Sequence, residues 1–235
     1  NLCNFKKPLI LFYTDSRGFN VTSKFGKNPF QSYIKFFLRD YRVHYFICPE
    51  KHTTITDFLL KIESLKLDKY KFIIMNCGVV DFSPRPKSNL DWVLSSKKNN
   101  KYFQISLKSY PHHYNNLSDI LYNNEKTQNL YSKEFLKEEI IAELRKIKGL
   151  IWISSNIFVQ GWEGNYTKGR PSNIDDLVSN SDQIMETHLK NVVNLRTWKE
   201  EDIKKFTIDN IHFNEVGFKE VSKLIKAKIN ETKFE

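Results

Sequence analysis

Three side chains in this sequence are of the types that nucleophilic catalysis needs. Ser16 follows a short apolar run near the start of the chain, and Asp209 and His212 stand three residues apart near its end. A serine hydroxyl is a weak nucleophile until a base removes its proton, and histidine can do this near neutral pH. A carboxylate on the second ring nitrogen fixes the orientation of the histidine. The sequence therefore predicts Ser16 as nucleophile, His212 as base and Asp209 as the acid that orients it.

The segments around these residues resemble two sequence blocks of the SGNH (GDSL-like) hydrolase family. Residues 15–18, Asp-Ser-Arg-Gly, end a strand-like run as the family's first block does. Residues 209–218, Asp-Asn-Ile-His-Phe-Asn-Glu-Val-Gly-Phe, are similar to its last block. The order and spacing of the blocks extend the resemblance over nearly the whole chain. It implies a three-layer α/β/α fold, a covalent acyl intermediate on Ser16 and no cofactor.

The resemblance also implies three oxyanion donors, namely the Ser16 N–H, a glycine of the second block and an asparagine of the third. The second block falls at residues 52–57, which contain no glycine, and the third, Gly-Val-Val-Asp at 78–81, has Val80 in place of the asparagine. Thr14 stands where the first block usually has glycine. Loss of one donor costs about 10²–10³ in rate, so a replacement is expected. The candidates are the N–H of Gly78 or Val79 and the side chains of Arg85 and Asn156.

Other residues have both a functional and a structural interpretation. Arg17, beside the nucleophile, could bind an anionic group of the substrate or be a turn residue. Asp81 could position the second block or hydrogen-bond a nearby loop, and Trp162 could stack on a sugar. The pair His112 and His113 lacks a third ligand at suitable spacing, so no metal site is predicted.

Short apolar runs alternate with stretches of helical period along the chain. Strands that are apolar throughout and separated by helices indicate a parallel sheet covered on both faces. In such sheets, reactive groups gather at the carboxyl ends of the strands. We therefore predict a flavodoxin-like α/β/α sandwich with about five parallel strands, in which Ser16 lies near the loop of His212. The strands are expected at 8–13, 43–48, 71–77, 150–154 and 191–195, and the helices at 30–38, 55–65, 132–148, 173–189 and after residue 212.

The periodicity fails between residues 82 and 130, after the third expected strand. Prolines at 84, 86 and 111 and many Asn, Ser and Lys residues predict a long insertion with little regular structure, which could form a lid. The 235 residues are enough for one domain and few for two, so 1–235 is taken as a single domain.

The composition is that of a globular protein with an excess of basic residues. The formal net charge is +10, yet no basic run reaches five residues, so the charge favours a solvated surface over nucleic-acid binding. Three cysteines without close spacing, Cys3, Cys48 and Cys77, suit a reducing compartment, and no apolar stretch approaches 18 residues. We expect a cytoplasmic location and no membrane span.

The resemblance favours an esterase that removes O-acyl groups, most simply O-acetyl groups, from a carbohydrate. Residues 78–85 resemble a Gly-Ile-Val-Asp-x-x-Pro-Arg variant of SGNH-like proteins associated with bacterial surface polysaccharides. The expected partner is thus an acylated glycan, which could be anionic. Two alternatives stay open. One is an O-acyltransferase that uses the same residues on a bacterial glycan, and the other is a carbohydrate-binding domain that has lost its oxyanion hole.

Overall fold

The computed structural model describes residues 7–232, which form an α/β fold around a five-stranded parallel sheet. The strands lie in the order β2-β1-β3-β7-β8, with neighbours in parallel register. This is the doubly wound order, in which the first crossover, from β1 to β2, runs toward one edge of the sheet and the later ones, from β2 to β3, β7 and then β8, run toward the other edge. All five strands overlap the segments that the apolar runs predict, and β1 and β2 extend one residue beyond them. They are β1 (Leu9–Thr14), β2 (Arg42–Ile47), β3 (Phe72–Asn76), β7 (Leu150–Ile153) and β8 (Val192–Val193).

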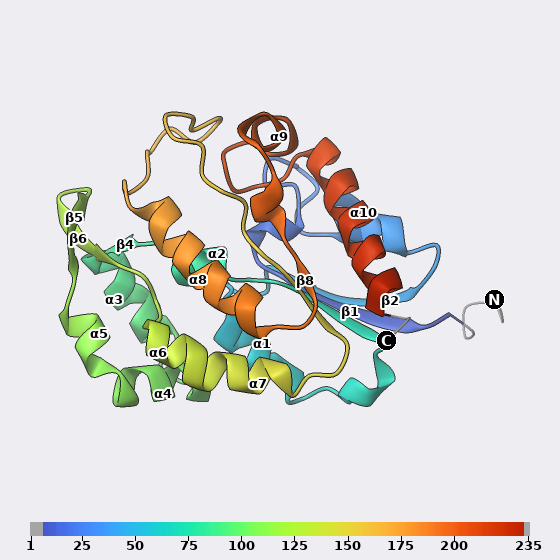
Figure 1. The fold of residues 1–235 in the computed structure, drawn as a ribbon, viewed down its shortest axis with the longest axis horizontal. Coiled ribbons are helices and arrows are strands. Elements are labelled where there is room, and N and C mark those ends of the chain that lie inside the picture. The colour runs from blue at the N-terminus through green and yellow to red at the C-terminus, as the bar shows by residue number, and fades with distance from the viewer. Residues whose placement is uncertain (1–6, 233–235) are drawn as a thin grey trace.

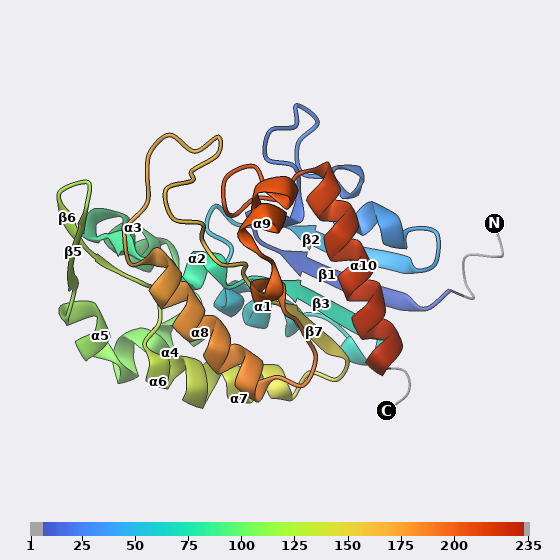
Figure 2. The ribbon, with the colours of Figure 1, turned by 45° about the horizontal axis from the view of Figure 1, so that its top comes forward.

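Helices cover both faces of the sheet, so that the strands alternate their side chains between two apolar cores (Figures 1 and 2). Leu11, Tyr13 and Met75 point into one core, and Phe12 and Ile74 into the other. This alternation is the period of two of a strand, and burial on both faces explains the continuous apolar runs. The first core is closed by α1 (Ile55–Ile62), α7 (Ile141–Arg145) and α8 (Ile174–His188), the second by α9 (Glu200–Phe206) and α10 (Glu215–Thr232).

The segment 82–130 is not irregular, which corrects the expectation of little regular structure. It contains three helices and three short strands. Leu90, Val93 and Phe103 join its helices to the first core, which shows why the segment is ordered. Its elements are β4 (Arg85–Pro86), α3 (Lys87–Ser96), α4 (Lys101–Ser109), α5 (Pro111–Asn115), β5 (Ser118–Tyr122) and β6 (Glu125–Gln128), with the strands in the order β4-β6-β5.

Two predicted helices also differ from expectation. Residues 30–38 form two 3-10 turns, Pro29–Gln31 and Tyr33–Phe37, in which Ser32 ends the first and caps the second. The helix expected at 132–148 is divided into α6 (Lys133–Phe135), a π-helical turn (Leu136–Ile140) and α7. Residues 30–38 still pack in the second core, and residues 132–148 in the first.

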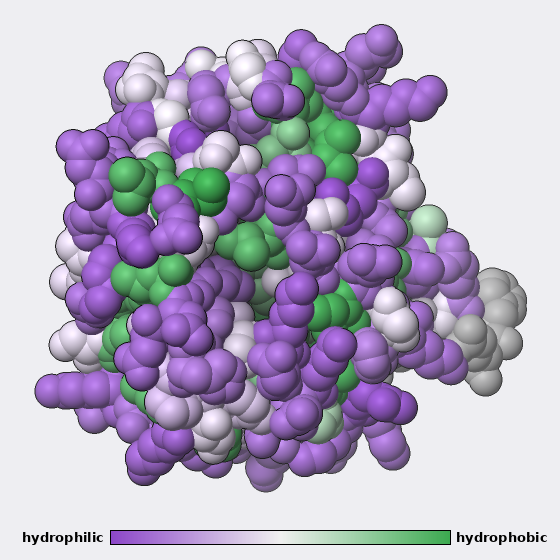
Figure 3. All heavy atoms as spheres, turned by 60° about the vertical axis from the view of Figure 1, so that its left-hand side comes forward, coloured by the Kyte–Doolittle hydropathy of each residue, from purple (hydrophilic) through white to green (hydrophobic). Residues whose placement is uncertain are grey.

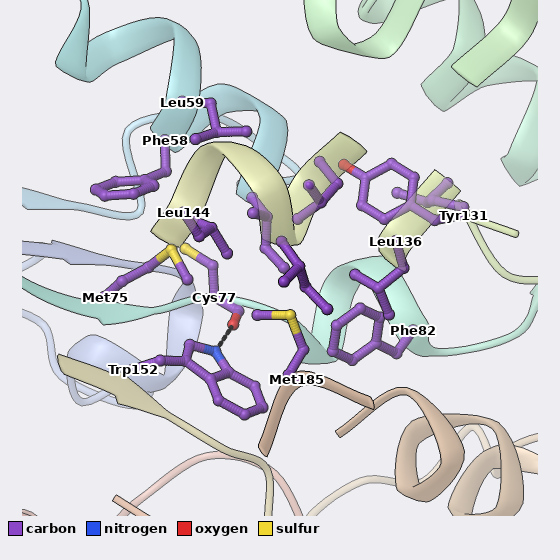
Figure 4. Close-up of a cluster of buried hydrophobic side chains, with 14 of the residues drawn as sticks. Phe58, Leu59, Met75, Cys77, Phe82, Tyr131, Leu136, Leu144, Trp152 and Met185 are labelled. Carbon is purple, nitrogen blue, oxygen red and sulfur yellow. Dashed lines mark hydrogen bonds between the residues drawn. The ribbon is translucent and has the colours of Figure 1, made fainter. Parts of the chain in front are cut away.

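Trp152 connects the middle of the sheet to the turn that follows β3. Its indole lies in the first core among Cys77, Phe82 and Met185, and its Nε1–H donates to the Cys77 carbonyl at 2.8 Å (Figure 4). The buried side chain thereby fixes the backbone just before Gly78 and α2 (Val79–Phe82). It belongs to the core.

Candidate active site

Ser16 begins a 3-10 turn directly after β1, at the carboxyl end of the sheet. Asp15 caps this turn by accepting a hydrogen bond from the Arg17 N–H at 2.9 Å. The chain then passes so close to β1 that a Cβ on Gly18 would lie 1.9 Å from Thr14 Oγ1. Gly18 therefore makes room for Thr14, the residue that replaces the usual glycine of the first block. The half-buried Ser16 side chain is left at the surface of the sheet end.

The loop between α9 and α10 holds Asp209 and His212 in a fixed conformation. Asn210 between them has φ 67°, a left-handed conformation that asparagine tolerates. Its carboxamide Oδ1 accepts from the Val159 N–H at 2.9 Å, and its Nδ2 donates to the Val159 carbonyl at 3.2 Å. The loop is thus bound to the segment after β7.

Ser16, His212 and Asp209 form a continuous hydrogen-bonded chain. Ser16 Oγ lies 2.9 Å from His212 Nε2, and His212 Nδ1 lies 2.8 Å from Asp209 Oδ2. The second oxygen of Asp209 accepts from the N–H groups of Ile211 and His212, at 3.2 and 2.8 Å. Burial alone would raise the pKa of Asp209, but these hydrogen bonds and the imidazole lower that pKa below its ordinary value. An ionised Asp209 favours the tautomer in which Nε2 can accept the serine proton.

Arg170 is a further charged residue at this site, and the sequence motifs give no sign of it. Its Nη2 donates to the Asp209 carbonyl at 2.6 Å and lies 3.7 Å from the Asp209 carboxylate. Its Nη1 pairs with Glu163, and its guanidinium lies 4.3 Å above the centre of the Tyr166 ring. Only the fold brings the 161–171 loop against the last block, so spacing along the chain could not identify the contact.

A cavity of about 630 Å³ opens over the hydroxyl of Ser16. The insertion forms one wall, with Arg85, and the 161–171 loop forms another. The two walls meet where the Tyr122 hydroxyl, at the end of β5, donates to the carbonyl of Gly169 at 3.0 Å. On the side of the molecule where the insertion comes forward, the surface is mostly hydrophilic with separate apolar patches (Figure 3). The cavity is large enough for a small ligand or a sugar unit.

Solved structures of ester-cleaving enzymes share this architecture. The lipase/acylhydrolase from Enterococcus faecalis has a TM-score of 0.54 and 15% identity, with 96% of this chain and 94% of that chain covered. An acetyl xylan esterase has a TM-score of 0.52 and 14% identity, with 93% and 98% covered. A protein described as a GDSL-like lipase from Parabacteroides merdae has a TM-score of 0.50 and 12% identity, with 96% and 97% covered. The chain has the SGNH hydrolase fold. No protein-family model and no curated protein matches the sequence.

Within the SGNH fold, five of the six predicted oxyanion and substrate-binding residues, all except Arg85, do not line the cavity over Ser16. Arg17 is buried, with its Nε on the Asp15 carboxylate at 3.2 Å and its Nη1 donating to the Ser154 carbonyl. Asp81 is buried and accepts from the Ile55 N–H at 3.0 Å, and burial raises its pKa to about 7. Asn156 donates to the backbone carbonyls of residues 157 and 210, and Trp162 packs against the second core.

The third block of the SGNH fold does reach the cavity. Gly78 has φ 140° and begins α2, whose first residues Val79 and Val80 line the cavity beside Ser16. The first N–H groups of a helix have no partner inside it, so the Val79 N–H stays a candidate oxyanion donor. Arg85 lines the same cavity.

Among residues 7–232, no cluster of three or more His, Cys, Asp or Glu side chains could hold a metal ion. His113 instead pairs with the backbone carbonyl of Asn129 at 3.0 Å. In the same range, no helix is both long and apolar enough to cross a membrane. Cys48 and Cys77 are buried free thiols, and Cys3 lies outside the described residues.

Proposed function

We propose that this chain is a serine esterase that removes O-acyl groups, with O-acetyl as the simplest case, from a carbohydrate. The observation that carries the proposal is the hydrogen-bonded chain from Ser16 through His212 to Asp209 at the base of a cavity. The SGNH fold and the acetyl xylan esterase among the similar structures support ester cleavage on a sugar.

The geometry permits the usual two-step reaction of a serine esterase. His212 Nε2 takes the proton of Ser16 as Oγ attacks the ester carbonyl, and the negative charge on the carbonyl oxygen is bound by N–H groups. The candidate donors are the N–H groups of Ser16 and Val79. As the bond from the carbonyl carbon to the sugar oxygen breaks, His212 gives its proton to that oxygen. The sugar leaves with a free hydroxyl, and the acyl group stays on Ser16. Water then attacks this ester with His212 again as base. The bond between the acyl carbon and Ser16 Oγ breaks, His212 returns the proton to Oγ and the free acid leaves, while Asp209 stabilises the imidazolium in both steps.

A covalent probe tests the proposal directly. A fluorophosphonate should add once to the wild-type protein, as seen by intact mass, and should not add to Ser16→Ala or His212→Ala. The adduct should form together with turnover of 4-nitrophenyl acetate. A folded wild-type protein that forms no adduct would contradict the proposal and favour the carbohydrate-binding alternative.

Acyl transfer to a second sugar is the other candidate, favoured by the contact of Tyr122 with the Gly169 carbonyl beside the cavity. When the cavity is closed, water reaches the acyl-enzyme less often, so hydrolysis is slower and a second sugar hydroxyl can accept the acyl group. Transfer requires an acyl donor and an acceptor, whereas the esterase releases free acid from acylated substrate alone. Measuring both products from the same reaction separates the two.

A further inference from the structure

Arg85 is held rigidly in the wall of the cavity that contains Ser16. Its Nη2 donates to the Val80 carbonyl at 2.6 Å, and its Nη1 donates to Asn89 Oδ1 at 3.1 Å. These bonds join the guanidinium to α2 on one side and to α3 on the other. A guanidinium fixed in this way loses little further freedom when it binds a ligand.

Most of the hydrogen-bonding capacity of Arg85 is unused. A guanidinium has five N–H donors, and two are engaged here. Its Nε is buried and has no partner, and within residues 7–232 no carboxylate forms an ion pair with it. Burial lowers the pKa of Arg85 to about 10, a decrease that the charge of the nearby Asp81 carboxylate partly opposes, so the group is charged at neutral pH. Asp81 itself accepts a hydrogen bond from the Ile55 N–H and does not line the cavity. A partly buried cation with free donors gains stability when an anion pairs with it.

The carboxylates of the cavity wall already have other partners. Glu125 accepts from the N–H and the hydroxyl of Ser88, at 2.6 and 2.8 Å, and Asp209 accepts from His212. Arg170 is neutralised by Glu163. The nearby His52 is neutral and adds no second positive charge, because burial first, and then Arg85 and two lysines, lower its pKa to about 4.

We infer that Arg85 binds a carboxylate of the substrate, so that the preferred substrate is an O-acylated acidic sugar of the uronic-acid type. The planar fork of arginine matches the two oxygens of a carboxylate. One guanidinium with unused donors suits a monoanion better than a doubly charged phosphate ester. The inference rests on the proposed esterase function and adds the substrate class to it.

Matched substrates provide the test. O-acetylated methyl glucuronide and O-acetylated methyl glucoside differ at C6, where the first has a carboxylate. Wild-type kcat/KM should be about 10- to 100-fold higher for the glucuronide, the range expected of a hydrogen-bonded charge pair. Arg85→Gln should reduce this ratio to near one, and Arg85→Lys, which keeps the charge without the fork, should leave an intermediate ratio. Arg39→Gln is the control, because Arg39 is exposed and does not line the cavity.

Two results would overturn the inference. One is a wild-type ratio near one, and the other is an Arg85→Gln protein in which both substrates slow equally, since Arg85 would then only brace α2. Turnover of 4-nitrophenyl acetate with no preference for the glucuronide rejects the carboxylate site and keeps the esterase. If turnover is absent, calorimetric binding of glucuronate against glucose to Ser16→Ala still decides whether the site exists, with thermal unfolding confirming that each variant is folded.

Discussion

At the residue scale, Arg170 contacts the acid of the Ser16–His212–Asp209 chain from a neighbouring loop. It donates to the Asp209 carbonyl and places its charge 3.7 Å from the Asp209 carboxylate. Its side chain is only 7% exposed, so the charge is weakly screened by water. Glu163 and the Tyr166 ring hold the guanidinium in place. Arg170 is therefore a positioning residue rather than a group that touches the ester.

Replacing Arg170 with Gln should reduce kcat by about 10- to 100-fold, which is the loss expected when a hydrogen bond from a charged group disappears. The acidic limb of the pH–rate profile should also move to higher pH, because the guanidinium no longer opposes protonation of the Asp209 carboxylate. Arg145→Gln, an exposed arginine on α7, serves as the control. An unchanged pH profile would show that Arg170 acts only as a structural brace.

Gly18 gives a second prediction at this scale. Alanine there would place Cβ 1.9 Å from Thr14 Oγ1 and 2.4 Å from Thr14 Cβ, so Gly18→Ala should destabilise the protein by about 1–3 kcal/mol. Thr14→Gly removes both atoms and should restore part of the loss. Urea unfolding of the two single variants and the double variant measures the coupling, which should be favourable by about 0.5–3 kcal/mol. Additive effects would show that the two residues do not compete for space.

At the element scale, the sequence predicted the sheet and missed the structure of the insertion. The central strands β1, β3 and β7 are buried on both faces, so their apolar runs are visible without knowledge of the fold. The insertion instead buries only a few side chains of each short helix, such as Leu90 and Val93 of α3. Its prolines were interpreted as breaks, whereas Pro86 directly precedes α3 and Pro111 is the first residue of α5. Proline is common at helix starts because its missing N–H is not needed there.

The candidate active site likewise contains residues that the sequence predicted and residues that it missed. The first and last blocks lie at ends of predicted elements, so the proximity of Ser16 to the loop of His212 followed from the topology. Arg17 was predicted to contact substrate because it adjoins Ser16, but the direction of its side chain depends on Asp15 and on the Ser154 carbonyl across the sheet. Arg170 had no motif at all. Contacts between loops are determined by the folded structure and cannot be obtained from periodicity.

The hydrogen bond between β5 and the 161–171 loop is expected to hold this loop closed over the cavity. Tyr122→Phe removes the hydroxyl that donates to the Gly169 carbonyl, at a cost of about 0.5–1.5 kcal/mol. The loop should then open about 2- to 10-fold more often, which hydrogen–deuterium exchange of residues 160–171 would report. Tyr45→Phe on β2 is the control, since Tyr45 is exposed and does not line the cavity. Equal exchange in both variants would exclude a latch at Tyr122.

At the scale of the whole molecule, charged groups are buried beneath the nucleophile. Asp15 and Arg17 form an ion pair in which both side chains are at most 1% exposed. Asp182 of α8 is also buried, and its Oδ2 accepts from the Ser155 N–H at 2.8 Å. Burial raises the pKa of Asp182 to about 7, an increase that the Ser155 hydrogen bond and Arg17 only partly oppose. These buried side chains do not line the cavity over Ser16, so replacing them should change the free energy of unfolding.

The stability of the protein should therefore depend on pH through Asp182. Its pKa is about 7 when folded and 3.8 when unfolded, so between these values the folded state keeps a proton that the unfolded state releases. The stabilising contribution is complete below about pH 4 and is lost as the pH rises through 7, at a rate of up to about 1.4 kcal/mol per pH unit.

Asp182→Asn keeps the acceptor for Ser155 but cannot ionise. In urea unfolding at pH 5, 6, 7 and 8, the free energy of unfolding of the wild-type protein relative to this variant should fall between pH 5 and 7 and then level off. Asp176→Asn, at an exposed position of the same helix, should follow the wild-type curve. A difference between wild type and Asp182→Asn that is constant from pH 5 to 8 would mean that Asp182 is already ionised in the folded protein.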